Sequence, residues 1–221
     1  AHTVSVVTAE ADGLSATARL RVVPPLPWSF DFSDKQVPPT WIGAAYRHQV
    51  RDVDSNPMLV KITTIPKGTR SQCWMGPWDL HDYTIQADLR GTMKNNKLPD
   101  MGVINQRYTL DLMGSTKQLQ IRSWTSRLEL RFAKTIPFPV ESDMWYTMKF
   151  RADNADGKAV LRGKVWPRDQ KEPAQWTIEA ADEAPNVVGS PGLFGNASDA
   201  EIFIDNVKVF PNGGTLKASG S

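Results

Sequence analysis

The stretch MGVINQRYTLDLMG, residues 101–114, decides the fold class of this 221-residue chain. Successive side chains of a β-strand point to opposite faces, so a strand that covers a core alternates between apolar and polar residues. Residues 103–112 keep this two-residue period, with Ile104, Tyr108, Leu110 and Leu112 on one face and Asn105, Arg107, Thr109 and Asp111 on the other. The stretch therefore predicts a single strand with its apolar face on a core and its polar face outward.

About eleven short runs of this kind follow one another from Trp28 onward, and helical periodicity is almost absent. Turn residues separate the runs, as in residues 153–157 and in the glycine-rich residues 190–192. Regular short strands with this punctuation predict an all-β fold, an antiparallel two-sheet β-sandwich. In the last run, residues 201–211, Phe203 lies opposite Ile202 and Ile204, so we expect this strand to be covered on both faces.

The N-terminal segment forms a unit of its own. Residues 3–23 are two alternating runs around Asp12-Gly13, a dipeptide that suits the positive φ angles of a tight hairpin turn. Residues 24–27, PPLP, are a stiff spacer. The sequence thus predicts three parts: a β-hairpin in residues 1–24, a sandwich in residues 25–211 and a flexible tail in residues 212–221.

Composition limits the partners. The formal net charge is 26 − 24 = +2, so charge predicts neither a nucleic-acid partner nor a membrane surface. No run of 18 or more apolar residues is present, so no membrane insertion is expected. The single cysteine, Cys73, excludes an internal disulfide and is interpreted as a buried small hydrophobic residue.

Polar side chains gather on the predicted outer face of four consecutive strands, residues 83–90, 103–112, 119–124 and 128–132. Consecutive strands with short turns pair as a meander. Their outer faces would make one continuous surface of Asp88, Arg107, Asp111, Arg122, Trp124, Glu129 and Arg131. An outward indole stacks on the apolar face of a sugar ring while planar charged groups bind hydroxyls, which predicts a carbohydrate-binding surface. The alternative is a solvated sheet face with ordinary ion pairs.

A catalytic alternative uses the acids of the same surface. Glycoside hydrolysis requires two carboxyl groups about 5–9.5 Å apart, and Asp88, Asp111 and Glu129 are the candidates. Arginines flank Glu129 and would keep it ionised, which makes it a poor general acid. The residues therefore favour binding over catalysis, without excluding an enzyme.

Two longer stretches carry a family resemblance. WYTMKFRADNADGKAVLRGKVWPRDQKEPAQWTIEAAD (residues 145–182) and GSPGLFGNASDAEIFIDNVKVF (residues 189–210) resemble the C-terminal half of concanavalin A-like (laminin G-like) jelly rolls. Residues 41–61, together with DYTIQADLRGT and DMGVINQRYTLDLMG, look like the module that follows a pyrroloquinoline-quinone-like β-propeller in large exported bacterial proteins, especially of planctomycetes. Residues 3–23 resemble the last two strands of a bacterial immunoglobulin-like domain.

The resemblance implies a noncatalytic accessory module outside the cytoplasm, periplasmic, on the cell surface or secreted. Its partners would be a polysaccharide and other domains of the same parent protein. The propeller is not in this sequence, so a quinone cofactor is not carried over. A purely structural module, packed on a propeller or a partner chain, is the third hypothesis.

Many relatives of the implied jelly roll hold a structural calcium ion. The matching positions here are Asp31 or Asp34 in FDFSD and Asp205 in IDNV. Calcium takes six to eight oxygen ligands, so these acids would supply only part of a site. The alternative is that Asp205-Asn206 ends the alternation and hydrogen-bonds a neighbouring loop.

Overall fold

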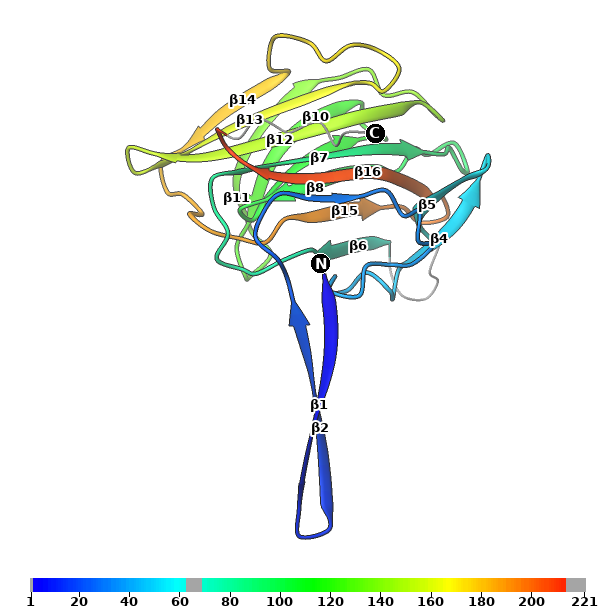
Figure 1. Ribbon diagram of the computed structural model, residues 1–221. Coiled ribbons are helices and arrows are strands. Elements are labelled where there is room, and N and C mark those ends of the chain that lie inside the picture. The colour runs from blue at the N-terminus through cyan, green and yellow to red at the C-terminus, as the bar shows by residue number, and fades with distance from the viewer. Residues whose placement is uncertain (1, 63–68, 214–221) are drawn as a thin grey trace.

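The computed structural model describes residues 2–62 and 69–213 and confirms the predicted all-β sandwich. Sixteen strands form three antiparallel sheets among these residues (Figure 1). A two-stranded sheet contains β1 (Thr3–Ala11) and β2 (Leu14–Val22). No helix long and apolar enough to cross a membrane occurs in the described part of the chain.

The two larger sheets form the sandwich. The six-stranded sheet has the order β11 (Leu130–Pro137), β10 (Gln118–Trp124), β9 (Tyr108–Met113), β8 (Asp100–Asn105), β15 (Gly192–Asn196) and β6 (Arg70–Trp74). The eight-stranded sheet has the order β14 (Ile178–Asp182), β13 (Lys158–Pro167), β12 (Trp145–Ala155), β7 (Tyr83–Gly91), β16 (Ile202–Pro211), β5 (Asn56–Lys61) and β4 (His48–Val53), and β3 (Trp28–Phe30) pairs with β16.

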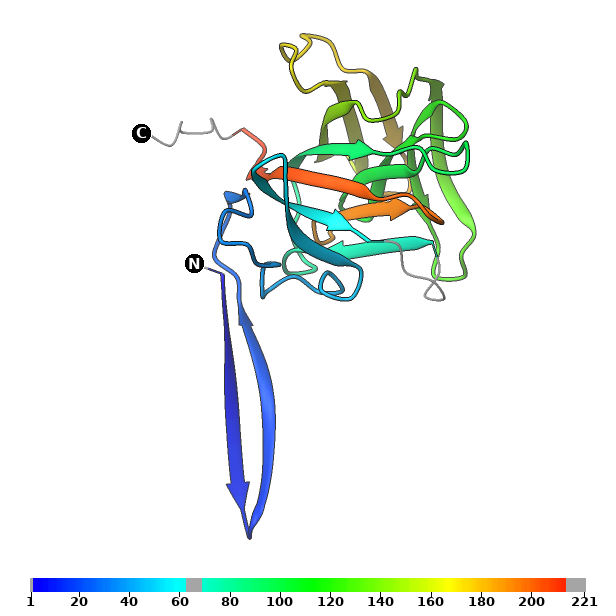
Figure 2. The same cartoon turned by 90° about the vertical axis from the view of Figure 1, so that its right-hand side faces the viewer.

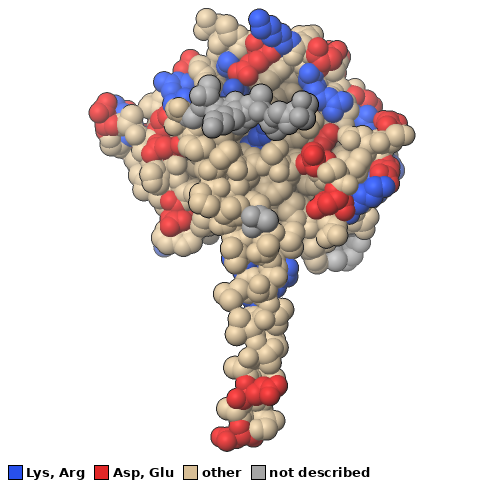
Figure 3. Space-filling model, viewed as in Figure 1, with Lys and Arg blue, Asp and Glu red and all other residues tan. Residues whose placement is uncertain are grey.

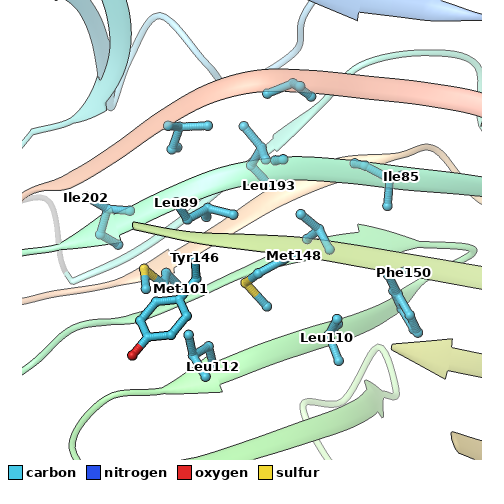
Figure 4. Packing of buried hydrophobic residues seen from close by; sticks show 14 of the residues in the cluster. Ile85, Leu89, Met101, Leu110, Leu112, Tyr146, Met148, Phe150, Leu193 and Ile202 are labelled. Atoms are coloured by element: carbon cyan, nitrogen blue, oxygen red, sulfur yellow. The ribbon is translucent and has the colours of Figure 1, made fainter. Parts of the chain in front are cut away.

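The core fills the space between these two sheets. Ile85, Leu89, Met148 and Phe150 from β7 and β12 are fully buried. They face side chains of the six-stranded sheet, among them Met101, Leu110, Leu112 and Leu193 (Figure 4). Burial of apolar surface on this scale is the main stabilising contribution to a sandwich.

β16 is covered on both faces, as the sequence predicted. Ile202 and Ile204 lie in the main core, with at most 2% of their surface exposed. Phe203 packs on the outer face of the same sheet against Met58 and Val60, and the Arg90 guanidinium lies 4.5 Å from its ring centre.

The N-terminal hairpin projects away from the sandwich (Figures 1 and 2). Its turn at Asp12 and Gly13 has the predicted positive φ angles, 50° and 76°. Val6, Leu14 and Leu20 are 66%, 77% and 52% exposed, so the ribbon has no core of its own. At its base, His2 Nδ1 is hydrogen-bonded to Thr40 Oγ1 at 2.9 Å, and Arg19 donates to the Pro39 carbonyl at 3.1 Å.

The predicted single strand over residues 103–112 is wrong, because β8 and β9 are joined by a tight turn at Gln106 and Arg107, with φ angles of 46° and 67°. In their register Val103 pairs with Leu110, so an odd residue of β8 shares a face with an even residue of β9. The side chain of Ile104 therefore points away from the core between the sheets. Asn105 is fully buried, where its amide donates to the carbonyls of Tyr83 and Phe150.

Three further local predictions are corrected. Leu128 and Leu130 were expected in the core but are 76% and 49% exposed, because residues 125–129 form a turn and β11 begins only at Leu130. The glycine-rich turn ends at Pro191, and Gly192–Asn196 is β15, an interior strand between β8 and β6. The predicted tail begins too early, since Asn212 donates to the Asp82 and Ala152 carbonyls; residues 214–221 lie outside the described residues.

Candidate functional site

A hollow of about 330 Å³ opens on the outer face of the six-stranded sheet. This volume falls at the lower end of the range, roughly 300–1,000 Å³, in which small ligands are bound. Its lining comes from β6, β9, β10, β15 and the turn before β11: Arg70, Ser71, Gln72, Thr109, Arg122, Trp124, Leu128 and Phe194.

Strand register brings these distant segments together. Thr109 on β9 is paired directly with Arg122 on β10. Phe194 on β15 is paired with Gln72 on β6 and, on its other side, with Gly102 on β8. A Cβ at Gly102 would collide with the backbone of Leu110 on β9, so only glycine fits between Phe194 and the strand that carries Thr109.

Arg122 is the central cation of the hollow. Its guanidinium lies 4.8 Å from the ring centre of Phe194 and 6.0 Å from that of Trp124. It forms an ion pair with Asp111, and its side chain is only 12% exposed. Aromatic neighbours and a buried counterion together hold the planar guanidinium in one orientation.

Asp111 lies beside the hollow, completely buried on β9. Burial disfavours its charged form and raises the pKa of this carboxyl to about 7, although the positive charge of Arg122 opposes the shift. The negative charge of Asp100 adds to the increase. The charge of Asp111, and with it the net charge of the Asp111–Arg122 pair, therefore changes near neutral pH.

Trp124 and Leu128 form an exposed apolar wall of the hollow. The Trp124 side chain is 40% exposed, and Leu128 is presented by the turn of residues 125–129. No residue of the N-terminal hairpin lines the hollow. Trp124 is therefore not buried against the hairpin within the described part of this chain.

Three of the seven predicted surface residues come together at this site. Arg122 and Trp124 line the hollow, and Asp111 pairs with Arg122 without being exposed. The expectation that Asp111 faces solvent is wrong. Asp111 is completely buried beside the Arg122 guanidinium, which itself lies close to the Phe194 ring.

Three other predicted residues lie near this sheet but outside the lining. Arg107 is exposed in the β8–β9 turn, where its carbonyl accepts from Ser123. Glu129 is exposed in the turn before β11. Arg131 points to the edge of the sandwich and pairs with Asp182 at 2.6 Å, because the register shifts next to Trp124.

Asp88 is on the opposite side of the molecule from the predicted surface. The meander continues through β8, β9, β10 and β11, but β7 belongs to the eight-stranded sheet between β12 and β16. Asp88 accepts hydrogen bonds from Thr147 at 2.6 Å and from the Asn206 amide at 2.9 Å. The three candidate catalytic acids thus do not share one surface. Asp88 lies on the opposite sheet, Asp111 is completely buried, and Glu129 lies in an exposed turn.

The predicted metal residues are engaged with protein donors. Asp205 accepts from the Asn56 amide at 2.9 Å and from the backbone N–H of Asn206 at 2.8 Å. Asp31 accepts from Ser33, and Asp34 from the backbone of Gln36. Burial raises the pKa of Asp205, and neighbouring Asp88 adds to this, although the two asparagine hydrogen bonds oppose it.

These hydrogen bonds do not make a calcium site. Within residues 2–62 and 69–213, no group of three or more His, Cys, Asp and Glu side chains is placed to hold a metal ion. Structural calcium stays a prediction from the resemblance.

Sequence reasoning missed most of the basic and apolar lining. Residues 70–74 were not recognised as a strand, and Phe194 was assigned to the segment around a turn. The clue that was available is the alternation of Arg70, Gln72 and Trp74 with buried Ser71 and Cys73. Cys73 is buried, as predicted.

No protein-family profile and no curated protein matches the sequence. Solved structures do match. The carbohydrate-binding module CBM66 from Bacillus subtilis has a TM-score of 0.52 and 12% identity, over 77% of this chain and 94% of that one. Lectin II from Ulex europaeus has a TM-score of 0.51 and 10% identity, over 84% of this chain and 97% of that one.

A third match comes from a study of endo-acting O-glycanases that members of the human gut microbiota express to initiate mucin breakdown. Its TM-score is 0.54 and its identity 11%, over 83% of this chain and 98% of that one. The chain has a lectin-type β-sandwich fold. At these identities the likeness concerns the fold alone, so the function must be argued from the hollow itself.

Proposed function

We propose that this chain is a noncatalytic carbohydrate-binding module that binds a saccharide in the hollow over Trp124. The observation that carries the proposal is the exposed indole of Trp124 next to Arg122, which is held by Phe194 and Asp111. The indole offers an apolar surface to a sugar ring, and the fixed guanidinium offers N–H donors to its oxygen atoms. Carbohydrate-binding modules and lectins with the same fold support this assignment.

The proposal includes a setting, an accessory module of an exported, extracytoplasmic modular protein. Support for this setting comes from the resemblance to modules that follow a β-propeller. It also comes from the hairpin, whose apolar residues are exposed on a ribbon that pairs with no other strand of residues 2–62 and 69–213. An isolated two-stranded ribbon is marginally stable by itself, so a neighbouring domain would stabilise it.

Binding is favoured over glycoside cleavage because of the position of the acids. A general acid must reach the glycosidic oxygen. Asp111 has the raised pKa that such a role requires, but it is completely buried. Asp88 lies on the eight-stranded sheet and Glu129 lies in the turn before β11. No two of the three acids therefore face each other on this surface.

The test is affinity electrophoresis through gels that contain soluble polysaccharides, with the wild type and Trp124→Ala. We expect one or more polysaccharides to retard the wild type, and Trp124→Ala to weaken this binding about 30-fold, since a central aromatic residue contributes roughly 2 kcal/mol or more.

Trp78→Ala is the matched control, because Trp78 is 75% exposed and does not line the hollow. Equal loss of binding in both variants would contradict the assignment of this site. Migration unaffected by every polysaccharide would contradict glycan binding altogether.

A further inference from the structure

We infer that the hollow selects an anionic saccharide, one whose rings carry carboxylate groups, over a neutral one. The inference rests on the proposed function and assigns its ligand class. It is carried by the charges that line the hollow and by the donors that Arg122 leaves free.

The charged residues of the lining are all basic. Among the described residues that line the hollow, Arg70 and Arg122 are charged and none is acidic. They lie on β6 and β10, with β15, β8 and β9 between them. Adjacent strands lie about 4.8 Å apart, so the two backbones are separated by roughly 19 Å. The side chain of Arg122 spans part of this distance, since its guanidinium lies 4.8 Å from the ring centre of Phe194 on β15, next to β6. Both arginines therefore line one hollow, an arrangement that suits an anionic ligand.

Arg122 has donors available for a ligand. Its ion pair with Asp111 and its hydrogen bond to Gln120 both use Nη1. Its Nε is buried and therefore closed to a ligand, whereas its Nη2 makes no hydrogen bond or ion pair with the described residues. The Nη2 group carries two N–H donors of the planar guanidinium, so a carboxylate of the ligand would find unused donors there.

The nearby acids do not cancel this positive charge. Asp111 is buried on the protein side of Arg122, and its carboxyl is raised in pKa, so it is partly protonated near neutrality. The other charged groups that act on it are Asp100 on β8 and Arg70 on β6. Asp100 accepts from the Asn196 amide at 3.2 Å and does not line the hollow, while β15 contributes the uncharged Phe194.

A polysaccharide and its methyl ester separate the effect of charge from that of ring stacking. The probes are polygalacturonate and alginate, each compared with its own esterified form, in affinity electrophoresis at about pH 6, where sugar carboxylates remain ionised. We expect at least one of the two acidic polymers to bind about tenfold more tightly than its ester, as a charge-assisted hydrogen bond would give.

Two variants locate the effect. Arg70→Gln should weaken binding of the acidic polymer about tenfold and leave binding of the ester unchanged. Arg21→Gln removes the same charge from the exposed hairpin and should have no effect. Poly-glutamate, a polyanion without sugar rings, should bind no more tightly to the wild type than to Trp124→Ala.

The outcomes distinguish this inference from the function on which it rests. Esters bound as tightly as acids, with binding still lost in Trp124→Ala, would overturn the anionic ligand class and retain the glycan site. Equal loss in Arg70→Gln and Arg21→Gln, or poly-glutamate bound as tightly as the acidic polysaccharides, would reduce the effect to net charge and overturn the inference. If none of these polymers binds but another polysaccharide binds through Trp124, the anionic ligand class is overturned and the glycan site is retained. If no polysaccharide binds, the proposed function fails as well.

Discussion

Single residues determine how the hollow responds to its surroundings, and the pair of Asp111 and Arg122 is the main example. Asp111 is a carboxylate without exposed surface whose pKa is raised to about 7 by burial. Its partner Arg122 lines the hollow, with its guanidinium close to the rings of Phe194 and Trp124. Proton uptake by Asp111 would leave the guanidinium with its full positive charge for a ligand.

This pair predicts a pH dependence of binding. As the pH falls from about 8 to 6, Asp111 becomes protonated while a sugar carboxylate stays ionised, so binding of an acidic glycan should strengthen. Asp111→Asn imitates the protonated form and should bind as tightly at pH 8 as at pH 6. Titration calorimetry at the two pH values is the measurement; an unchanged pH dependence in Asp111→Asn would show that another group titrates.

Stability should follow the same protonation. The folded-state pKa of Asp111 is raised above its unfolded value near 4, so between the two values the folded state binds more protons. The free energy of unfolding should therefore decrease as the pH rises from about 4 to 7, and this contribution should be absent in Asp111→Asn.

At the scale of the elements, the two sheets are clamped at one edge by Asp182 on β14. Its carboxylate accepts from the Tyr108 hydroxyl on β9 and from Arg131 on β11, each at 2.6 Å, and from the backbone of Ala184 at 3.0 Å. Burial alone would raise the pKa of Asp182, but the Arg131 and Tyr108 hydrogen bonds hold it below the usual value.

We predict that Asp182→Ala lowers the free energy of unfolding by about 3 kcal/mol, because it leaves a hydroxyl and a guanidinium without their acceptor. Glu179→Ala is the control on the same strand. Its ion pair with Arg162 is exposed, so its loss should cost less than about 1 kcal/mol. Urea denaturation at neutral pH measures both, and equal effects would contradict the clamp.

The clamp also has a defined pH range. A carboxyl whose folded pKa is lowered stabilises the protein above its unfolded pKa, near 3.8, and this contribution is lost as the pH falls through the folded value. The difference between wild type and Asp182→Ala should therefore shrink in strongly acidic solution.

For the whole molecule, the sandwich and the hairpin are structurally separate. Among the described residues, the strands β1 and β2 pair only with each other, and their apolar side chains are exposed (Figures 1 and 2). On the face shown in Figure 3, acidic and basic residues are interspersed over the sandwich, in keeping with the net charge of +2.

Removal of residues 1–22 should leave the sandwich folded and its glycan binding intact. The truncated chain loses the ring contacts of His2 with Trp28 and Phe30 and two hydrogen bonds, to Thr40 and to the Pro39 carbonyl, which predicts a melting midpoint lower by only a few degrees. Calorimetry and affinity electrophoresis measure the two properties. Loss of the cooperative transition would show that the hairpin is an integral part of the fold.

Calcium is tested on the whole molecule as well. The structural calcium implied by the resemblance predicts a higher melting midpoint with calcium than with chelator, because a ligand that binds the folded state raises its stability. An equal midpoint would contradict this prediction, and Asp31, Asp34 and Asp205 would then serve as acceptors for protein donors.

The sequence by itself determined the properties that depend on local alternation. The all-β class, the hairpin turn at Asp12-Gly13, the double-sided burial of β16 and the outward position of Trp124 all follow from a period of two residues. Only the tertiary structure decided which strands are neighbours. It placed β7 and Asp88 in the other sheet, and it inserted β15 between β8 and β6, which brought Phe194 beside Gln72. The reason is that side-chain alternation is set by each strand alone, whereas strand order depends on backbone pairing between segments more than a hundred residues apart, which no local pattern records.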